Sequence, residues 1–337
     1  MRIATYNVEW FTNLFNRRGE LLLDDQWSGR QDVTRAQQIE ALAKVFTALD
    51  ADAVMVIEAP DDNSRRSSRV ALENFAEAFG LRTRKALIGF SNHTQQEIAL
   101  LYDPDTIMAS HDPQENGEAA PRFDGEFEID LDVDANLDRI TFSKPPLEVA
   151  AKNGEFGFRL IGVHVKSKAP HGARNRAEEM RIAIANRRKQ LAQCIWLRGR
   201  VRHHLSSGDP LIVLGDFNDG PGLDEYEKLF GRSGVEIVLG EEENDPSLRL
   251  FDPHAQTVLN QRIAPGISSS RFYIAKEKRY LSALLDYVMV CPQILARRPN
   301  WRIWHPFDDP DCYNKTELRE ALLLASDHFP VSVDFEG

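Results

Sequence analysis

The sequence predicts an α+β fold in which strands and helices share one domain. Short apolar runs that are typical of buried strands recur from one end of the chain to the other. Segments with apolar residues at helical spacing lie between them. Polar side chains suited to a reaction stand at the strand ends along the whole length of 337 residues. A division into two independent domains would separate these side chains, so we expect a single domain over residues 1–337 with insertions.

Six apolar runs predict strands that carry polar side chains at or near their ends. The runs cover 2–6, 54–57, 160–163, 211–215, 284–290 and 329–333. The fourth run follows Pro210 and ends at Gly215, as a buried strand bounded by chain breakers would. Asp286 lies inside the fifth run, where it could also hydrogen-bond the backbone. In chain order the polar residues are Asn7, Glu58, His164 with Lys166, Asp216 with Asn218, Asp286, and Asp327 with His328.

Each of these residues has an ordinary structural explanation as well. Asn7, Asp216 and Asn218 could belong to turns, where Asn and Asp are common. Glu58 could be a solvated loop acid, and His164 could be a core histidine with satisfied hydrogen bonds. The two-residue spacing of Asp216 and Asn218, however, places both side chains on one face of an extended segment. Six strand ends with this set of side chains favour a common site.

In this order the residues resemble the endonuclease/exonuclease/phosphatase superfamily, the metal-dependent phosphoesterases that include DNase I-like nucleases and abasic-site endonucleases. The resemblance runs from Thr5–Asn7 to Ser326–His328. It implies a DNase I-like, four-layer α/β/β/α sandwich, with two mainly antiparallel sheets face to face and helices outside. It does not name the substrate, because the same site serves nucleic acids, phosphoinositides, sphingomyelin and small phosphate esters.

Three helices are predicted for the outer layers. Two of them cover 34–49 and 69–79, and a third, basic helix lies between His171 and His204. That last stretch holds nine Arg or Lys against two Glu, and its apolar residues recur at four- and seven-residue steps (Met180, Ile184, Leu191 and Ile195), so we expect it to pack on the sheet. A second basic segment, 271–279, precedes Asp286. The two segments could hold a polyanion beside the site, or they could simply be solvated.

An acidic insertion is expected near 110–140, where residues 112–138 hold ten acids and one arginine. Alternation of apolar and acidic residues over 126–133 predicts a strand with one buried and one acidic face. We interpret the acidic face as solvated and protective of a sheet edge. A calcium site is the alternative. The net charge of −11 argues against a tight, nonspecific coat on DNA but does not exclude a nuclease.

The resemblance also implies a divalent cation, Mg²⁺ first, with Mn²⁺ and Ca²⁺ as alternatives. Glu58 would be its main ligand, and Asn7 would support the cation or the substrate phosphate. Asp327 would lie near the cation or near His328. A bound cation neutralises phosphate oxygens and stabilises the leaving oxygen.

The remaining residues would act on the phosphodiester itself. Asp216 would orient or deprotonate the attacking water, and Asn218 would hold that water or a phosphate oxygen. His328 would stabilise the phosphoryl charge, with Asp286 fixing its tautomer. His164 would protonate the leaving oxygen or bind a phosphate oxygen. Lys166 is a further predicted phosphate contact, and Lys168 a weaker one.

Two positions depart from the family pattern. Ile57 precedes Glu58 where the family often has glutamine. His164 stands where abasic-site endonucleases place a tyrosine, so the chain is more similar to the DNase I-like and sphingomyelinase-like branches.

A metal-dependent nuclease acting on DNA or RNA is the leading functional hypothesis. The alternatives are a phosphatase or a phosphodiesterase acting on a lipid or small molecule, and a noncatalytic binding module of the same fold. No apolar run is long enough for a transmembrane segment, and the three cysteines form no disulfide or metal pattern. The first residues contain no hydrophobic signal region, so we expect a cytoplasmic protein, or a secreted one whose signal has been removed. No signal for an oligomeric state is found.

Overall fold

Two β-sheets form the centre of the computed structural model, which describes residues 1–337 apart from 93, 95, 116–119, 132–136, 171, 221–230, 261–265, 275–277 and 337. The larger sheet contains β1 (Arg2–Asn7), β2 (Ala53–Ala59), β3 (Lys85–Ile88), β4 (Glu97–Tyr102), β14 (Asn300–Ile303) and β15 (Val331–Asp334). The smaller sheet contains β5 (Met108–His111), β8 (Leu147–Asn153), β9 (Phe156–His164), β10 (Leu211–Asp216) and β13 (Asp286–Val290). Their strand orders are β14-β15-β1-β2-β4-β3 and β13-β10-β9-β8-β5. Among these strands the pairs β1–β2 and β9–β10 are parallel, and the other pairs are antiparallel.

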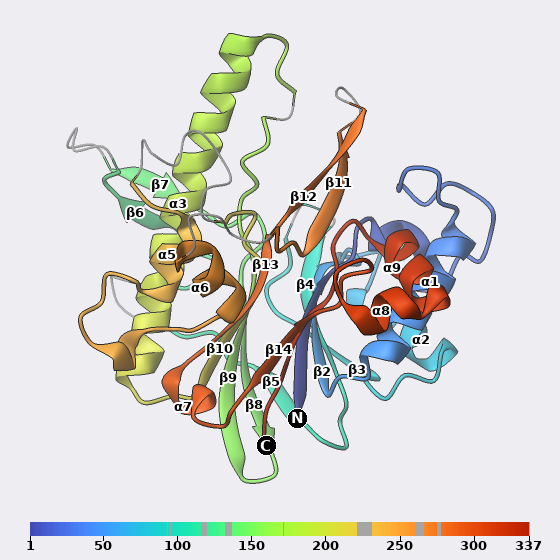
Figure 1. Ribbon diagram of the computed structural model, residues 1–337, viewed down its shortest axis with the longest axis horizontal. Helices are drawn as coiled ribbons and strands as arrows, with labels where there is room; N and C mark the ends of the chain where they lie inside the picture. The colour runs from blue at the N-terminus through green and yellow to red at the C-terminus, as the bar shows by residue number, and fades with distance from the viewer. Residues whose placement is uncertain are drawn as a thin grey trace.

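Helices cover the outer face of each sheet (Figure 1). On the side of the larger sheet lie η1 (Phe11–Leu14), α1 (Arg35–Leu49), α2 (Ser68–Ala78), α8 (Pro310–Asn314) and α9 (Thr316–Ala325). On the side of the smaller sheet lie α3 (Arg176–Ser206), α5 (Gly234–Leu239), η2 (Pro246–Leu248) and α6 (Pro253–Asn260), and α7 (Pro292–Leu295) follows β13. The predicted four-layer α/β/β/α sandwich is confirmed. No helix of the described residues has the length and apolarity needed to cross a bilayer.

The alternation of side chains along β2 creates two cores. Met55 and Ile57 point into the core between the sheets, whereas Val54 and Val56 point into the core beneath α1, α2 and α9. A Cβ atom at position 162 would overlap the Met55 side chain, so Gly162 allows β9 and β2 to approach closely.

The predicted helices are present with small shifts of their ends. Thr34 and Gln37 form a capping box at the start of α1, which fixes its first turn. The basic helix α3 spans 31 residues, and its first turns rise beyond the sandwich (Figure 1). Our expectation that its whole apolar stripe packs on the sheet is correct for Leu191, which is buried, and wrong for Met180, which is 45% exposed. Met180 lies in the projecting part, where no sheet is within reach.

Two small hairpins complete the fold. The acidic insertion forms β6 (Phe127–Ile129) and β7 (Asp138–Ile140), and Phe127 stacks on Trp196 of α3 while Glu128 is exposed. The acidic residues Glu118, Asp132 and Asp134 and the apolar Val133 of this region lie outside the described residues. The second basic segment forms β11 (Ser270–Ile274) and β12 (Arg279–Ala283), with Lys276 outside the described residues.

Candidate active site

The strand ends named by the sequence meet at one edge of the sandwich. Asp216 is paired with His164 across β10 and β9, and with Asp286 across β10 and β13. The three side-chain positions therefore form a row across the smaller sheet. Asn7 ends β1 of the larger sheet, and its Nδ2 donates a hydrogen bond of 3.0 Å to Oδ2 of Asp216. This bond joins the two sheets at the site.

Asp216 is a buried carboxylate held by three hydrogen bonds. Besides Asn7, the backbone N–H of Asn218 donates to Oδ1 at 2.7 Å and the Asn218 Nδ2 donates to Oδ2 at 3.1 Å. Burial raises the pKa of Asp216 to about 7, although the charge of His328 opposes the rise. A carboxylate with this pKa can accept a proton near neutral pH.

Asn218 adopts a left-handed backbone conformation with φ of 49°, which Asn tolerates better than most residues. Its Nδ2 also donates to the backbone oxygen of Val165 at 3.0 Å. Both amide protons are thereby used, so its side-chain oxygen is the atom left for a ligand.

His328 and Asp286 form a buried pair, with Nδ1 of the histidine 2.7 Å from Oδ2 of the aspartate. The Ser269 hydroxyl donates to the same carboxylate oxygen at 2.7 Å. Burial lowers the pKa of His328, but Asp286, together with Asp216 and Asp327, raises it well above its ordinary value. His328 is therefore an imidazolium at neutral pH, with Nδ1–H directed to Asp286.

One ligand atom each of Asp216, Asp286 and His328 lies within 4.8 Å of the others, a spacing that could hold a cation. The charge of His328 balances one of the two carboxylates, so the cluster keeps one negative charge when Asp216 is ionised. The neighbouring acids are further candidate ligands for a cation.

Glu58 stands in a bulge between β2 and β4 with φ of 61°, a conformation that is unfavourable for glutamate. Gln96 Nε2 donates to its Oε2 at 2.5 Å, and its Oε1 lies 4.0 Å from Nε2 of His164. Burial raises the pKa of Glu58; Lys144 and His328 oppose this rise, whereas Asp327 adds to it.

Glu9 lies near Glu58 and Asp327, and the sequence analysis assigned it no role. Burial raises its pKa to about 7, and the charges of Asp327 and Glu58 add to the rise. Arg30 forms an ion pair with Glu9. The crowding of Glu9, Glu58 and Asp327 is an excess of negative charge that a divalent cation would relieve.

The side-chain oxygen of Asn7 supports the same interpretation. Oδ1 is buried and has no hydrogen-bond partner among the described residues. A buried acceptor without a partner costs free energy, and a neutral oxygen of this kind suits a hard cation such as Mg²⁺. The residues present thus fit an oxygen-ligated divalent cation.

His164 is oriented by a lysine that the sequence analysis missed. Nζ of Lys144 lies 3.0 Å from Nδ1 of His164. Nε2 of the same histidine lies 3.5 Å from Oδ2 of Asp216. Burial, with the nearby charges of Lys144, His328 and Lys166, lowers the pKa of His164 well below its ordinary value. His164 is therefore neutral, and because the Lys144 ammonium can only donate, the ring proton resides on Nε2.

Of the remaining predicted residues, some lie near the site and others form ion pairs that support the fold. Burial is the main reason that the pKa values of His164 and Lys144 are lowered, and the charge of Lys166, two residues after His164, adds to both shifts. Nζ of Lys168 lies 2.7 Å from Asp219, so this lysine is held by the scaffold. Burial is the largest influence on the pKa values of Glu58 and His328, and the charge of Asp327 raises both, so the role of Asp327 near the cation or near His328 stays a prediction.

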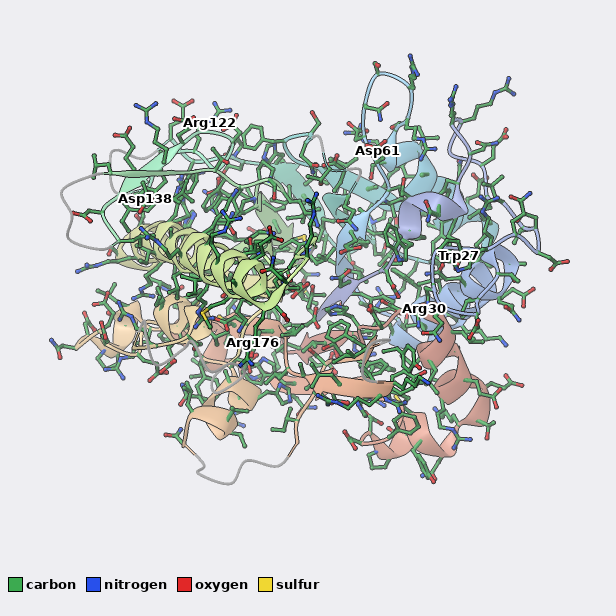
Figure 2. The ribbon with its side chains drawn as sticks, turned by 90° about the horizontal axis from the view of Figure 1, so that it is seen from above. Trp27, Arg30, Asp61, Arg122, Asp138 and Arg176 are labelled. Carbon is green, nitrogen blue, oxygen red and sulfur yellow. The ribbon has the colours of Figure 1, made fainter. Side chains whose placement is uncertain are left out.

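The basic helix α3 contains arginines of two kinds. Arg187 and Arg200 are buried, with Arg187 at 2.7 Å from Asp219 and Arg200 at 3.2 Å from Glu148. Neither the solvated nor the polyanion-binding interpretation applies to these two arginines, which stabilise the fold. Arg174, Arg176 and Arg181 are exposed, and Arg176 lies at the projecting end of α3 (Figure 2).

Comparisons with known proteins identify the family and the fold. The family model described as "Endonuclease/Exonuclease/phosphatase family" matches residues 4–328. Similar solved structures include a 3′-5′ exonuclease from Neisseria meningitidis (TM-score 0.51, 15% identity, 100% of both chains covered) and a mannosyl-6-phosphatase from Bacteroides thetaiotaomicron (0.51, 15%, 100% of both). TDP2 from Caenorhabditis elegans is also similar (0.52, 13%, 100% of this chain and 75% of the other). A search of curated proteins finds no match. At these identities the structural likeness supports the fold alone.

Proposed function

The chain belongs to the endonuclease/exonuclease/phosphatase family, whose members are hydrolytic phosphoesterases, and we propose that it uses a divalent cation and water to hydrolyse phosphodiester bonds of DNA or RNA. The observation that carries the proposal is the joining of Asp216 to Asn7 and of His328 to Asp286 in one buried cluster. Because both sheets supply these residues, we also propose that the chain acts as one domain.

Glu58 and Asn7 would hold the cation, with Glu9 and Asp327 completing an acidic set beside them. Mg²⁺ is the proposed ion, because it prefers carboxylates and retains several waters; Mn²⁺ or Ca²⁺ would suit the same oxygens. When bound, the cation would neutralise the phosphate oxygens and stabilise the leaving oxygen.

Asp216 would take a proton from the attacking water. Asn7 and Asn218 hold its carboxylate in place by hydrogen bonds, and burial raises its pKa to about 7, which suits a base at neutral pH. The side-chain oxygen of Asn218 would orient the same water.

His328 would donate from Nε2 to a phosphoryl oxygen on which charge develops. Asp286 and Ser269 occupy the opposite side of this unit and keep the proton on Nδ1. Of the two predicted roles of His164, we favour the hydrogen bond to a phosphate oxygen over protonation of the leaving group. A neutral imidazole with a lowered pKa is a weak acid but a good N–H donor. Lys166 would attract the phosphate as a point charge.

A polynucleotide is favoured over a small phosphate ester by the surroundings of the site. A hollow of about 590 Å³ beside Glu9 and Asp327 is lined by the rings of Phe272, Tyr273 and Tyr280. Aromatic faces of this kind stack nucleobases. The hairpin β11–β12 and the projecting, basic end of α3 both rise over this edge of the sandwich (Figure 1). One of the similar solved structures, a Neisseria 3′ phosphatase, is bound to a product DNA hairpin.

A substrate panel tests the proposal. It would contain single- and double-stranded DNA, RNA, a bis-aryl phosphodiester and an aryl phosphomonoester, each with Mg²⁺ or Mn²⁺, with EDTA, and with an Asp216→Ala control. Cation-dependent shortening of a polynucleotide is expected, and fragment lengths would distinguish internal from terminal cleavage. Turnover of the small esters alone would replace the nuclease by a phosphatase or a lipid enzyme. No turnover by folded protein on any member would favour a noncatalytic module.

A further inference from the structure

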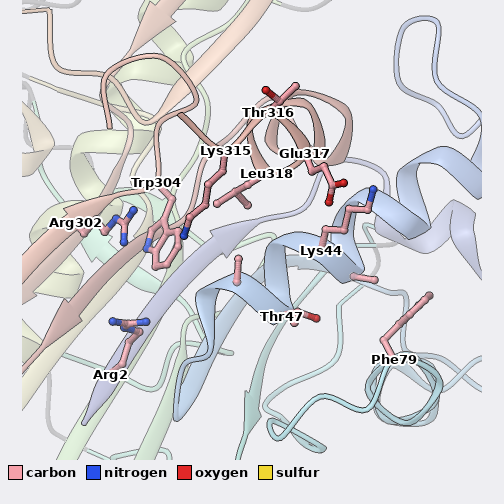
Figure 3. A pocket seen from close by; sticks show the side chains of 12 residues that line it. Arg2, Lys44, Thr47, Phe79, Arg302, Trp304, Lys315, Thr316, Glu317 and Leu318 are labelled. Atoms are coloured by element: carbon pink, nitrogen blue, oxygen red, sulfur yellow. The ribbon is translucent and has the colours of Figure 1, made fainter. Parts of the chain in front are cut away.

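A second hollow of about 830 Å³ lies away from the proposed active site, between α1, the start of α9 and the edge of the larger sheet (Figure 3). Arg2 lines it at the beginning of β1, whereas Asn7 of the active site stands at the other end of that strand. Five residues of extended chain separate the two sites by roughly 17 Å. Its volume falls in the range typical of small-molecule sites.

The floor of this hollow is aromatic and flanked by two arginines. Trp304 is only 4% exposed, and its indole N–H donates to Oγ of Ser332 at 3.0 Å, so it offers the hollow a small apolar edge and no free donor. The guanidinium of Arg302 lies 3.9 Å and that of Arg2 5.6 Å from the centre of this ring. Arg2 forms an ion pair with Asp334 and Arg302 forms one with Asp309, so both arginines offer less positive charge to a ligand.

Two lysines supply positive charge that is not neutralised by an ion pair among the described residues. Lys44 of α1 and Lys315 at the N-cap of α9 are exposed, and neither forms an ion pair within the described part of the chain. Figure 3 shows Lys315 ending beside the Trp304 ring and Lys44 extending toward Glu317, the single acid among the described lining residues. The rim thus carries a positive charge in a chain whose net charge is −11.

The start of α9 adds to this positive potential. No side chain caps the helix at Lys315, and Thr316 and Leu318 of its first turn line the hollow. The first N–H groups of a helix have no partner within the helix, and the helix dipole is positive at this end. They favour an anionic group at the mouth of the hollow.

We propose that this hollow binds a small organic anion whose carboxylate lies between Lys44, Lys315 and the start of α9, with its apolar body along the lining between Phe79 and the exposed edge of Trp304. The lysines at the rim would not attract a neutral apolar ligand, and the apolar lining would not stabilise a bare inorganic anion. Charge complementarity therefore selects a carboxylate with an apolar body. The site is independent of the proposed phosphoesterase reaction.

The experiment uses the full chain labelled with 5-fluorotryptophan, with 2-naphthoate as the probe and 2-naphthalenemethanol as its neutral counterpart. Fluorine NMR reports each tryptophan, and Trp304→Phe assigns the relevant signal. The Trp304 signal should shift saturably with 2-naphthoate, and the alcohol should bind about tenfold more weakly. The double variant Lys44→Gln/Lys315→Gln should weaken naphthoate binding about tenfold, because each exposed lysine contributes a modest attraction.

The double variant Lys85→Gln/Lys152→Gln removes the same charge at positions outside the hollow, and it should bind naphthoate like the parent protein. Three results would each overturn the proposal. They are an unmoved Trp304 signal, equal binding of the acid and the alcohol, and equal losses in the two double variants, which would indicate an effect of net charge rather than a built site.

Discussion

Replacing Lys144 by methionine is expected to slow phosphodiester cleavage strongly while the chain remains folded. Nζ of Lys144 lies 3.0 Å from Nδ1 of His164, whose side chain is only 8% exposed. Methionine keeps an unbranched chain of similar length but cannot donate a hydrogen bond. The ring proton of His164 could then move from Nε2 to Nδ1, and the residue would no longer present a donor to the phosphate.

The size of the effect follows from the bond that is lost. A hydrogen bond to a charged group contributes about 1.5–3 kcal/mol. A difference of about 1.4 kcal/mol is tenfold, so kcat/KM should fall by roughly ten- to 150-fold. Lys144 also lowers the pKa of Glu58. Its removal should raise that pKa, so the loss of activity on acidification should begin at a higher pH.

The assay is kcat/KM across the neutral pH range at several Mg²⁺ concentrations, with Lys152→Met as the matched control. Nζ of Lys152 lies 3.6 Å from the fully exposed Glu155 on β8–β9, far from any proposed role. Because Lys144 is itself a cation, its removal should not weaken the dependence on Mg²⁺. Nitrogen NMR of the imidazole should show a proton on Nε2 of His164 in the parent protein.

Two results would refute the reasoning about Lys144. One is a Lys144→Met variant that is folded and within about threefold of the control at every pH, since even a weak charged hydrogen bond would exceed that effect. The other is a His164 ring that carries its proton on Nδ1 in the parent protein, because Lys144 could not then donate to it.

Three further predictions concern pH, stability and substrate. The value of kcat/KM should rise as Asp216 loses its proton near pH 7 and fall at higher pH as His328 loses its own. Asp216→Asn should remove the rising part of this pH profile. Bound Mg²⁺ should shift the rising part to lower pH. Arg187→Met should lower the free energy of unfolding in urea by about 1.5–3 kcal/mol, because buried Asp219 loses one cationic partner and keeps Lys168, whereas the exposed Arg176→Met should change it by less than about 0.5 kcal/mol. Tyr280→Ala should raise KM for a polynucleotide by about tenfold, since stacking contributes roughly 1–3 kcal/mol per base, and leave KM for a bis-aryl phosphodiester unchanged; equal effects on both substrates would contradict the stacking role.

The sequence predicts the strand ends well because strand periodicity and chain breakers are local signals. Asn7 and Asp216 each stand at a strand terminus that the apolar runs locate to within a residue. Asp286, which the sequence places inside the run 284–290, is instead the first residue of β13. Once two sheets are assumed, such termini are expected to share an edge. The contact from Asn7 to Asp216 spans 209 residues, and it follows from the fold rather than from any local pattern.

Local sequence patterns do not predict residues that matter because of a tertiary contact across the site. Lys144 stands in a loop with no motif around it, and Ser269 precedes a hairpin whose docking against Asp286 is a tertiary feature. Glu9 could have been found, because it lies two residues after Asn7 at the same strand exit.

Charge counts along a helix also fail to distinguish buried from solvated groups. Arg187 and Arg200 belong to the same basic pattern as Arg176, yet each is buried against an acid from a distant segment. The pattern therefore predicts a polyanion surface that is larger than the exposed one.

The buried carboxylate of Asp216 is the proposed base of a cation-dependent hydrolysis. The most direct test is single-turnover cleavage by Asp216→Asn, using whichever ester the parent protein cleaves fastest, together with calorimetry of Mg²⁺ binding. The variant should lose about 10²–10⁴ in rate, the range that a general base contributes. Mg²⁺ binding should persist, because the proposed ligands are other residues. Undiminished cleavage by the folded variant would contradict this role of Asp216.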